Sequence, residues 1–328
     1  MPPLITLEEH FVSPTVRDAV KDQDFTRKIS KVSKQLECLS SERVQDMDNG
    51  NILIQVVSHS ASRGDIPVDL CRKANDELYQ ACKDSNGRLV GWAMLPMHDP
   101  PYATDELVRC VKNLGFVGAM IDNKCRGSFY DDISFWPIFE RAVELKVPIY
   151  LHPSLSGEDM AEHYKGNFPN SAAYSMSTAG IGWHQEVGLH VLRLFASGLF
   201  DAYPRLQIII GHMGEMLPCQ LDHIVGMTST WGLNLTRGLR QVWNENILVT
   251  TSGMFSMTPM TCLLRSTRID RIMYSVDYPF SSNETGLKFM EELRKSGLVT
   301  EEEFDMIAHR NAERVLKLNK NKKKHWVT

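Results

Sequence analysis

The chain has 328 residues, of which 43% are hydrophobic and 23% are charged, and its formal net charge is −4. This composition supplies enough apolar mass for one large core, and a slightly acidic chain has no excess positive charge to attract nucleic acid or an anionic membrane surface. No apolar stretch approaches the roughly 20 residues of a membrane span, and the first predicted strand leaves no room for a signal peptide. We therefore expect no membrane partner and a cytoplasmic location.

Eight short apolar runs predict eight strands. Most of them are rich in valine and isoleucine and lack a regular alternation of apolar and polar residues, as expected for strands that are buried on both faces. The runs are Leu4–Leu7, Ile52–Val57, Leu89–Leu95, Val117–Ile121, Val147–Leu151, Leu206–Ile210, Ile247–Thr250 and Ile272–Val276.

Segments with helical periodicity lie between most of these runs, for example Thr104–Leu114, Phe135–Leu145, His184–Phe200 and Gly286–Lys295. Strands that alternate with helices predict parallel βαβ units. Eight such units predict one α/β domain, a closed (β/α)8 TIM barrel over residues 1–318. An open, doubly wound sheet is the alternative, but no GxGxxG turn follows the first strand.

Two polar segments, residues 13–45 and 154–182, interrupt the repeating pattern after the first and fifth strands. Because both follow the carboxyl ends of strands, where barrels build active sites, they could form a lid or a wall of the substrate pocket; a passive surface loop is equally open. Residues 319–328 include four lysines and predict a flexible, basic tail.

The seven cysteines are scattered along the chain, and none belongs to a CxxC pair. An odd number of cysteines without paired spacing argues against a disulfide framework. It predicts buried free thiols in a reducing compartment.

Five residues that can bind a metal stand at the ends of four predicted strands. Glu8 and His10 are two positions apart, so an extended strand points both side chains to the same side. His152, His212 and Asp277 follow three further strands, and a barrel brings such strand ends to one face. Imidazole and carboxylate groups from separate strands can surround one divalent cation. The alternative is that each histidine is an unrelated core or surface residue.

His212 lies in the sequence Gly-His-Met-Gly-Glu, and Glu215 follows it by three positions. Glu215 could orient the imidazole or relay its proton, or it could be stabilised by a helix N-terminus. The other histidines carry less weight. His59 and His98 follow strands and could line the pocket, whereas a structural or surface role is expected for His163, His184, His190 and His309.

Several stretches together give the chain a family resemblance, among them Leu7–Phe11, Tyr150–Pro153, Gly211–Glu215 and Ser275–Phe280. The chain resembles the metal-dependent aromatic acid decarboxylases of the amidohydrolase superfamily. This is the ACMSD-related family, with the 2,3-dihydroxybenzoate, salicylate and γ-resorcylate decarboxylases. The resemblance implies a (β/α)8 barrel, non-oxidative decarboxylation of a small phenolic acid, and a homodimer or homotetramer.

The resemblance also implies roles for individual residues. Glu8, His10, His152 and Asp277 match metal ligands, and His212 with Glu215 matches an acid/base pair. One divalent cation is expected, with Zn2+ as the first choice and Mn2+ or Mg2+ as alternatives. Larger relatives hold a second metal through a modified lysine after the fourth strand, but Lys124 lies too far along the chain for that. His223 stands where the relatives carry an arginine near the substrate.

An ortho-hydroxybenzoate could chelate the cation, and Asp277 could then donate a proton to the ring carbon that bears the carboxylate. His212 would handle the phenolic proton. Phe11, Phe25 and Phe280 are candidates for the apolar pocket, although core packing would explain Phe11 and Phe25 equally well. Two other functions stay open: a metal-dependent hydrolase of a lactone or cyclic amide, and a barrel that binds a phenolic ligand without turnover.

Overall fold

The computed structural model describes residues 1–20, 30–60, 65–154 and 162–318. All eight predicted strands are present, and the run Leu89–Leu95 is divided into two strands at Trp92. The strands are β1 (Leu4–Phe11), β2 (Ile52–His59), β3 (Leu89–Gly91), β4 (Ala93–Met94), β5 (Ala119–Asp122), β6 (Ile149–His152), β7 (Ile208–Ile210), β8 (Ile247–Thr250) and β9 (Ile272–Met273).

The described strands pair in parallel and follow the order of the chain, β1-β2-β3 in one sheet and β4 through β9 in another. Two seams separate these sheets. The first seam lies at Trp92, between β3 and β4. Here the Trp92 amide donates a hydrogen bond to the carbonyl of Val57 on β2 at 2.8 Å. At the second, an isolated parallel bridge joins Glu9 to Tyr278, and the His10 amide donates to the Tyr278 carbonyl at 2.7 Å. The predicted (β/α)8 architecture is thus confirmed, with ladders interrupted at these two places.

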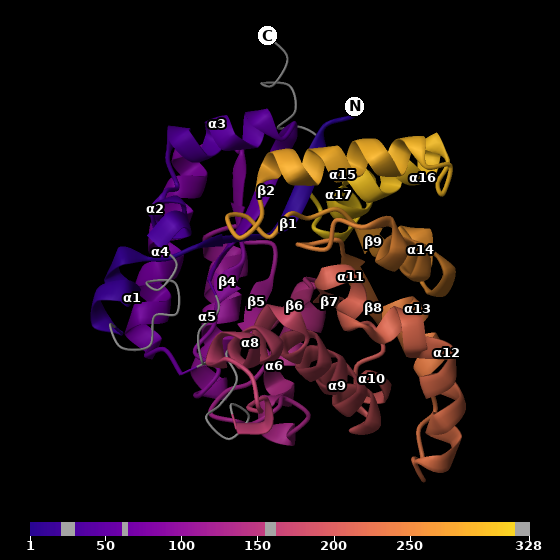
Figure 1. Ribbon diagram of the computed structural model, residues 1–328. Helices are drawn as coiled ribbons and strands as arrows, with labels where there is room; N and C mark the ends of the chain where they lie inside the picture. The colour runs from indigo at the N-terminus through magenta and orange to yellow at the C-terminus, as the bar shows by residue number, and fades with distance from the viewer. Residues whose placement is uncertain (21–29, 61–64, 155–161, 319–328) are drawn as a thin grey trace.

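Helices surround the strands, and α12 lies at the edge of the molecule (Figure 1). The main helices are α1 (Pro14–Ala19), α2 (Ser30–Glu37), α3 (Ser41–Asn49), α4 (Val68–Asp84), α5 (Pro100–Asn113), α6 (Trp136–Leu145), α8 (Asn170–Ser175), α9 (Gly182–Ala196), α10 (Leu199–Ala202), α11 (His212–Glu215), α12 (Leu217–Met227), α13 (Leu239–Asn246), α14 (Met257–Ser266), α15 (Asn283–Lys295), α16 (Glu301–Asp305) and α17 (Asn311–Val315). None of the described helices is both long and apolar enough to cross a membrane.

The core explains why the strands lack polar alternation. Ile149 and Leu151 of β6 belong to the apolar layer between strands and helices, whereas Tyr150 faces a second cluster with Ile209 and Leu248 from neighbouring strands. Successive side chains still point to opposite faces, but both faces are buried. The two-residue period therefore survives as a division between the inside of the barrel and the helical layer.

The two predicted insertions contain short helices. The described residues of 13–45 include α1, α2 and the first part of α3, and those of 154–182 include α8 and the short helical segment Met176–Gly180. Both segments follow the carboxyl ends of strands, and their role as a lid or a pocket wall stays a prediction. The predicted basic tail lies outside the described residues.

The expectation of free thiols is wrong for two cysteines. Cys219 on α12 and Cys262 on α14 form a disulfide, with their Cα atoms 5.6 Å apart. They are separated by 43 residues and meet only because the two helices pack together, so their spacing in the sequence carries no signal. The other five cysteines form no disulfide within the described residues.

Candidate metal centre and active site

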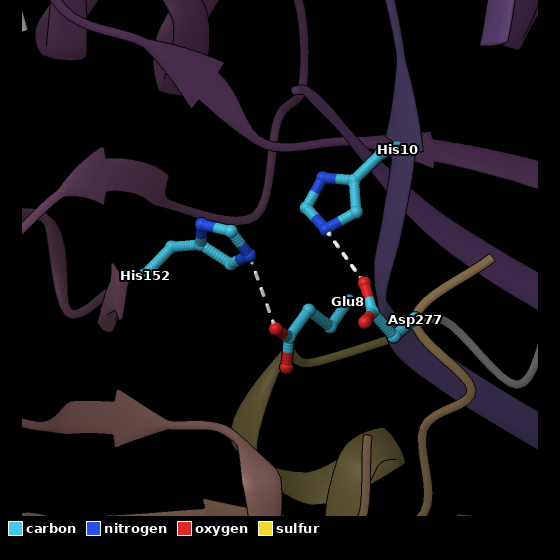
Figure 2. A group of neighbouring side chains, drawn as sticks. All are labelled: Glu8, His10, His152 and Asp277. Atoms are coloured by element: carbon cyan, nitrogen blue, oxygen red, sulfur yellow. Dashed lines mark ion pairs between the residues drawn. The ribbon is translucent and has the colours of Figure 1, made fainter. Parts of the chain in front are cut away.

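Four side chains from distant parts of the chain converge at the carboxyl ends of the strands. Glu8 and His10 come from β1, His152 ends β6, and Asp277 follows β9. Figure 2 shows their polar groups pointing toward one another. One candidate ligand atom from each lies within 4.8 Å of the other three.

The contacts between these atoms fit a shared cation. The Nε2 atom of His152 lies 3.2 Å from Glu8 Oε1, and the Nε2 atom of His10 lies 3.2 Å from Asp277 Oδ1. Ligand atoms that are each bound at about 2.1 Å to one cation lie roughly 3 to 4 Å from one another. Glu8 Oε1 and His10 Nε2 are also buried without a hydrogen-bond partner, which is costly unless a further group occupies the site.

The second oxygen of Glu8 is held by hydroxyl groups. Tyr150 and Ser252 donate short hydrogen bonds to Glu8 Oε2, and Thr250 donates a longer one at 3.4 Å. These contacts leave Oε1 as the atom that faces the cluster. Sequence reasoning missed all three residues, although Tyr150 shares the strand face of His152 and Ser252 lies two positions after Thr250.

The ring orientations of the two histidines suit metal binding. His152 Nδ1 donates to the Pro153 carbonyl at 2.7 Å, which leaves the Nε2 lone pair directed at the cluster. His10 Nδ1 lies 3.2 Å from the Ser58 hydroxyl. Burial lowers the pKa of His10. Burial also opposes the charged form of His152, but contact with Glu8 raises the pKa of His152 overall.

Asp277 lies on a tightly held segment. Its φ of +69° places the backbone in the left-handed region, which is unusual for a residue other than glycine. Glu9 of β1 is fully buried against this segment. It accepts hydrogen bonds from the Ser275 hydroxyl and from the backbone amides of Val276 and Tyr278. Burial raises the pKa of Glu9 to about 7 despite these contacts. Glu9 thus fixes the residues on either side of Asp277.

His212 and Glu215 meet through a left-handed turn. The non-glycine residues His212, Met213, Glu215 and Met216 have φ values of 49°, 56°, 54° and 65°. Each such residue costs of order 1–3 kcal/mol, so the rest of the fold must impose this conformation. The turn brings His212 Nδ1 to 2.8 Å from Glu215 Oε1. The opposite atom, His212 Nε2, faces Glu8 Oε1 at 3.6 Å and Asp277 Oδ2 at 3.8 Å.

The electrostatics of this pair favour an ionised Glu215. Burial alone would raise the pKa of Glu215, but His212 and His184 outweigh it and lower that pKa. Burial disfavours a charged His212, yet the carboxylates of Glu8 and Glu215 raise the pKa of His212 well above its ordinary value. Burial alone would raise the pKa of the Glu8 carboxyl, but His212 above all, together with His152 and His10, holds that pKa low.

The predicted substrate-binding residues are placed differently from one another. Phe280 is 37% exposed, and its ring centroid lies 5.7 Å from that of His10, at the mouth of the site. Phe11 is buried in the core against His59. Phe25 lies outside the described residues. His223 is exposed on α12, and the structure does not bring it to the cluster within this chain.

A small cavity extends from the cluster beside His152. Its walls are partly apolar, with Met94, Met97 and Met120, and partly polar, with His59, Ser60 and Asp122. Lys124 does not join the site, because its amine pairs with Glu186 and lies over the ring of Phe129. Among the described residues, the cluster therefore has the ligands of one cation and a small cavity next to it, with apolar walls on one part only.

Comparison with known proteins places this arrangement in a family. The model of the amidohydrolase family matches residues 52–318. The chain belongs to the amidohydrolase family. Within it, the chain is 46% identical to "Decarboxylase orsB" of Emericella nidulans, over 98% of this chain and 99% of that protein. It is 34% identical to a gamma-resorcylate decarboxylase of Polaromonas sp., over 96% of this chain and 99% of that protein.

A solved structure of the family supports the assignment. A dihydroxybenzoic acid decarboxylase from Polaromonas sp., with bound manganese and the inhibitor 2-nitroresorcinol, superposes with a TM-score of 0.86. It is 32% identical, and the match covers 98% of both chains. The protein is thus an amidohydrolase-family carboxy-lyase with a site for one divalent metal ion.

Proposed function

We propose that the protein catalyses the metal-dependent, non-oxidative decarboxylation of an ortho-hydroxy aromatic acid of the dihydroxybenzoate type. The observation that carries the proposal is the convergence of Glu8, His10, His152 and Asp277, with Glu8 Oε1 and His10 Nε2 buried without a hydrogen-bond partner. These four residues would hold the cation. The relatives named for γ-resorcylate and dihydroxybenzoic acid support this substrate class.

The bound cation would hold the substrate carboxylate and phenolic oxygens and favour the phenolate. Zn2+ was the first choice from the ligand types. Bound manganese in the Polaromonas structure makes Mn2+ an equal candidate, because mixed nitrogen and oxygen ligands suit both. Metal analysis of the purified protein would decide between them.

The remaining proton transfers would be carried out by different side chains. His212 Nε2 faces the site and would handle the phenolic proton or the charge that develops on the phenolic oxygen, while Glu215 supports the imidazole from the other side. Asp277, once protonated, would donate its proton to the ring carbon that bears the carboxylate. The bond from that carbon to the carboxylate then breaks, carbon dioxide leaves, and the electron pair restores the aromatic ring.

The pocket would bind the ring through apolar surfaces. Phe280 covers the mouth beside His10, and the cavity lined by Met94, Met97 and Met120 adjoins His152. Exclusion of water from this space favours loss of a charged carboxylate as neutral carbon dioxide. The homodimer or homotetramer expected from the family stays a prediction, which light scattering would test.

A carbon dioxide release assay over a panel of ortho-hydroxy aromatic acids tests the proposal. Asp277→Asn should lower kcat by at least about a hundredfold, since general acid catalysis alone contributes two to four orders of magnitude. Asp105→Asn, an exposed aspartate on α5, is the control and should retain full activity. Full activity in Asp277→Asn would refute the proton-donor role. Hydrolysis of a lactone or amide without carbon dioxide release would refute the proposed function.

A further inference from the structure

His184 was expected to be a structural residue of a helix, but it lies in contact with the proposed acid/base pair. Its Nδ1 atom is 2.7 Å from Glu215 Oε2, while His212 Nδ1 is 2.8 Å from the other oxygen, Glu215 Oε1. The ring centroids of the two histidines lie 4.9 Å apart. One buried carboxylate therefore serves two imidazoles, and only His212 faces the metal cluster.

Both ring nitrogens of His184 lie next to hydrogen-bond acceptors. His184 Nε2 lies 3.1 Å from the carbonyl oxygen of Ala179. A carbonyl can only accept a hydrogen bond, and an ionised carboxylate can only accept as well. A ring held between two acceptors satisfies both only with a proton on each nitrogen. The side chain of His184 is 5% exposed, so water cannot readily take over either contact.

His190, six residues later on the same helix, shows the opposite arrangement. The Tyr130 amide donates to His190 Nε2 at 2.9 Å, and His190 Nδ1 lies 3.0 Å from Asn123 Oδ1. One nitrogen of His190 accepts and the other donates, which is the pattern of a neutral imidazole. The contrast shows that the paired acceptors around His184 are a property of its position and not of α9 as a whole.

A glycine on α9 allows His184 to lie close to Glu215. Gly188 lies one helical turn after His184 on the same face of α9, and a Cβ atom there would come within 2.9 Å of the Glu215 carbonyl. Glycine thus allows α9 to approach the left-handed turn that carries His212 and Glu215. The close approach places the His184 ring directly behind the Glu215 carboxylate.

We infer that His184 is a positioning residue, which holds the Glu215 carboxylate from behind as the acceptor of the His212 Nδ1 proton. This arrangement turns the Nε2 atom of His212 toward the metal cluster. The inference goes beyond the acid/base pair and rests on the proposed function for its kinetic test. His184 acts only through Glu215 and does not touch the reacting atoms.

Two substitutions separate the contacts of His184. His184→Asn places an amide nitrogen near the position of Nδ1 and retains a donor to Glu215. His184→Gln places its amide near the position of Nε2 and retains only the contact with Ala179. In the metal-loaded enzyme we expect kcat of the glutamine variant to fall about 10- to 100-fold with little change in KM, and that of the asparagine variant to stay within about threefold of the wild type.

A double variant tests whether His184 acts through Glu215. The kcat of His184→Gln/Glu215→Gln should match that of Glu215→Gln within about twofold, because residues that act as a unit are not additive. Equal losses in the asparagine and glutamine variants, or additive losses in the double variant, would overturn the inference. If the glutamine variant does not fold, a tenfold loss of kcat in the asparagine variant alone would overturn the inference.

Crystal structures of the metal-loaded variants provide a readout that is independent of activity. The contact between His212 Nδ1 and Glu215 Oε1 should persist in His184→Asn and open beyond about 3.5 Å in His184→Gln. An unchanged contact in the glutamine variant would contradict the inference. A wild-type enzyme that releases no carbon dioxide from any acid in the panel would instead refute the proposed function, and the crystal structures would still decide the role of His184.

Discussion

At the scale of single residues, hydrogen-bond partners decide what each histidine can do. His152 donates its Nδ1 proton to a carbonyl and is left with a lone pair for a metal, whereas His184 lies between two acceptors. His190 is fully buried and both accepts and donates. His152 and His190 therefore share one arrangement, in which Nδ1 donates and Nε2 keeps a lone pair, whereas His184 faces two acceptors, and residue type alone does not reveal this difference.

The buried state of His190 predicts a dependence of stability on pH. Burial lowers the pKa of His190 to about 3, below its ordinary value of 6.5. The unfolded chain therefore binds a proton at this residue before the folded chain does. The stabilisation is complete above pH 6.5 and is lost as the pH falls toward 3, at no more than about 1.4 kcal/mol per pH unit.

Urea unfolding between pH 7 and pH 4 measures this effect. His190→Gln should show a shallower fall in stability over that range than the wild type. His163→Gln, at an exposed histidine, should follow the wild type and serves as the control. An identical pH dependence in His190→Gln and the wild type would contradict the assignment.

At the scale of elements, the site depends on how closely α9 approaches the turn α11. Exchange of glycine for alanine inside a helix normally stabilises it by about 1 kcal/mol. At Gly188 the added Cβ would lie 2.9 Å from the Glu215 carbonyl, so the helix or the turn must move. We expect Gly188→Ala to destabilise the protein by about 1–3 kcal/mol and to lower kcat through displacement of Glu215.

Gly226 on α12 provides a matched control. An added Cβ at this position meets nothing within 4 Å, so Gly226→Ala should be neutral or stabilising by up to about 1 kcal/mol. Thermal unfolding and carbon dioxide release are measured on both variants. Equal stability changes in the two variants would show that α9 can shift away from α11 without cost.

The elements also show what the sequence could predict. The eight apolar runs predicted every strand of the barrel, because burial on both faces leaves a clear signature. Strand ends also located Glu8, His10, His152 and Asp277, since parallel strands place such residues at one face. The left-handed turn of α11 and the approach of α9 were not predictable, because they arise from packing between segments. For the same reason, the sequence predicted only a structural or surface role for His184.

At the scale of the whole molecule, Glu9 joins the first strand to the segment after the last. It accepts hydrogen bonds from Ser275, Val276 and Tyr278 across the seam that completes the barrel. Glu9→Gln replaces one accepting oxygen with a donor, which must face groups that also donate. We expect a loss of stability of about 1–3 kcal/mol for each donor left unsatisfied, together with weaker metal binding through the displaced Asp277.

Urea unfolding and metal titration measure the two effects of Glu9→Gln. Glu291→Gln, at an exposed glutamate on α15, is the control and should change neither quantity. If Glu9→Gln behaves like Glu291→Gln, the seam does not depend on this carboxylate.

The ligands of the proposed cation come from residues 8, 10, 152 and 277, so almost the entire chain must be in place before they meet. A growing polypeptide that has not yet reached residue 277 lacks Asp277 and presents an incomplete set of donors. Tight capture of the metal is therefore expected only after synthesis is complete. The supply of the ion to the finished protein, rather than to the nascent chain, would then determine which metal the enzyme carries.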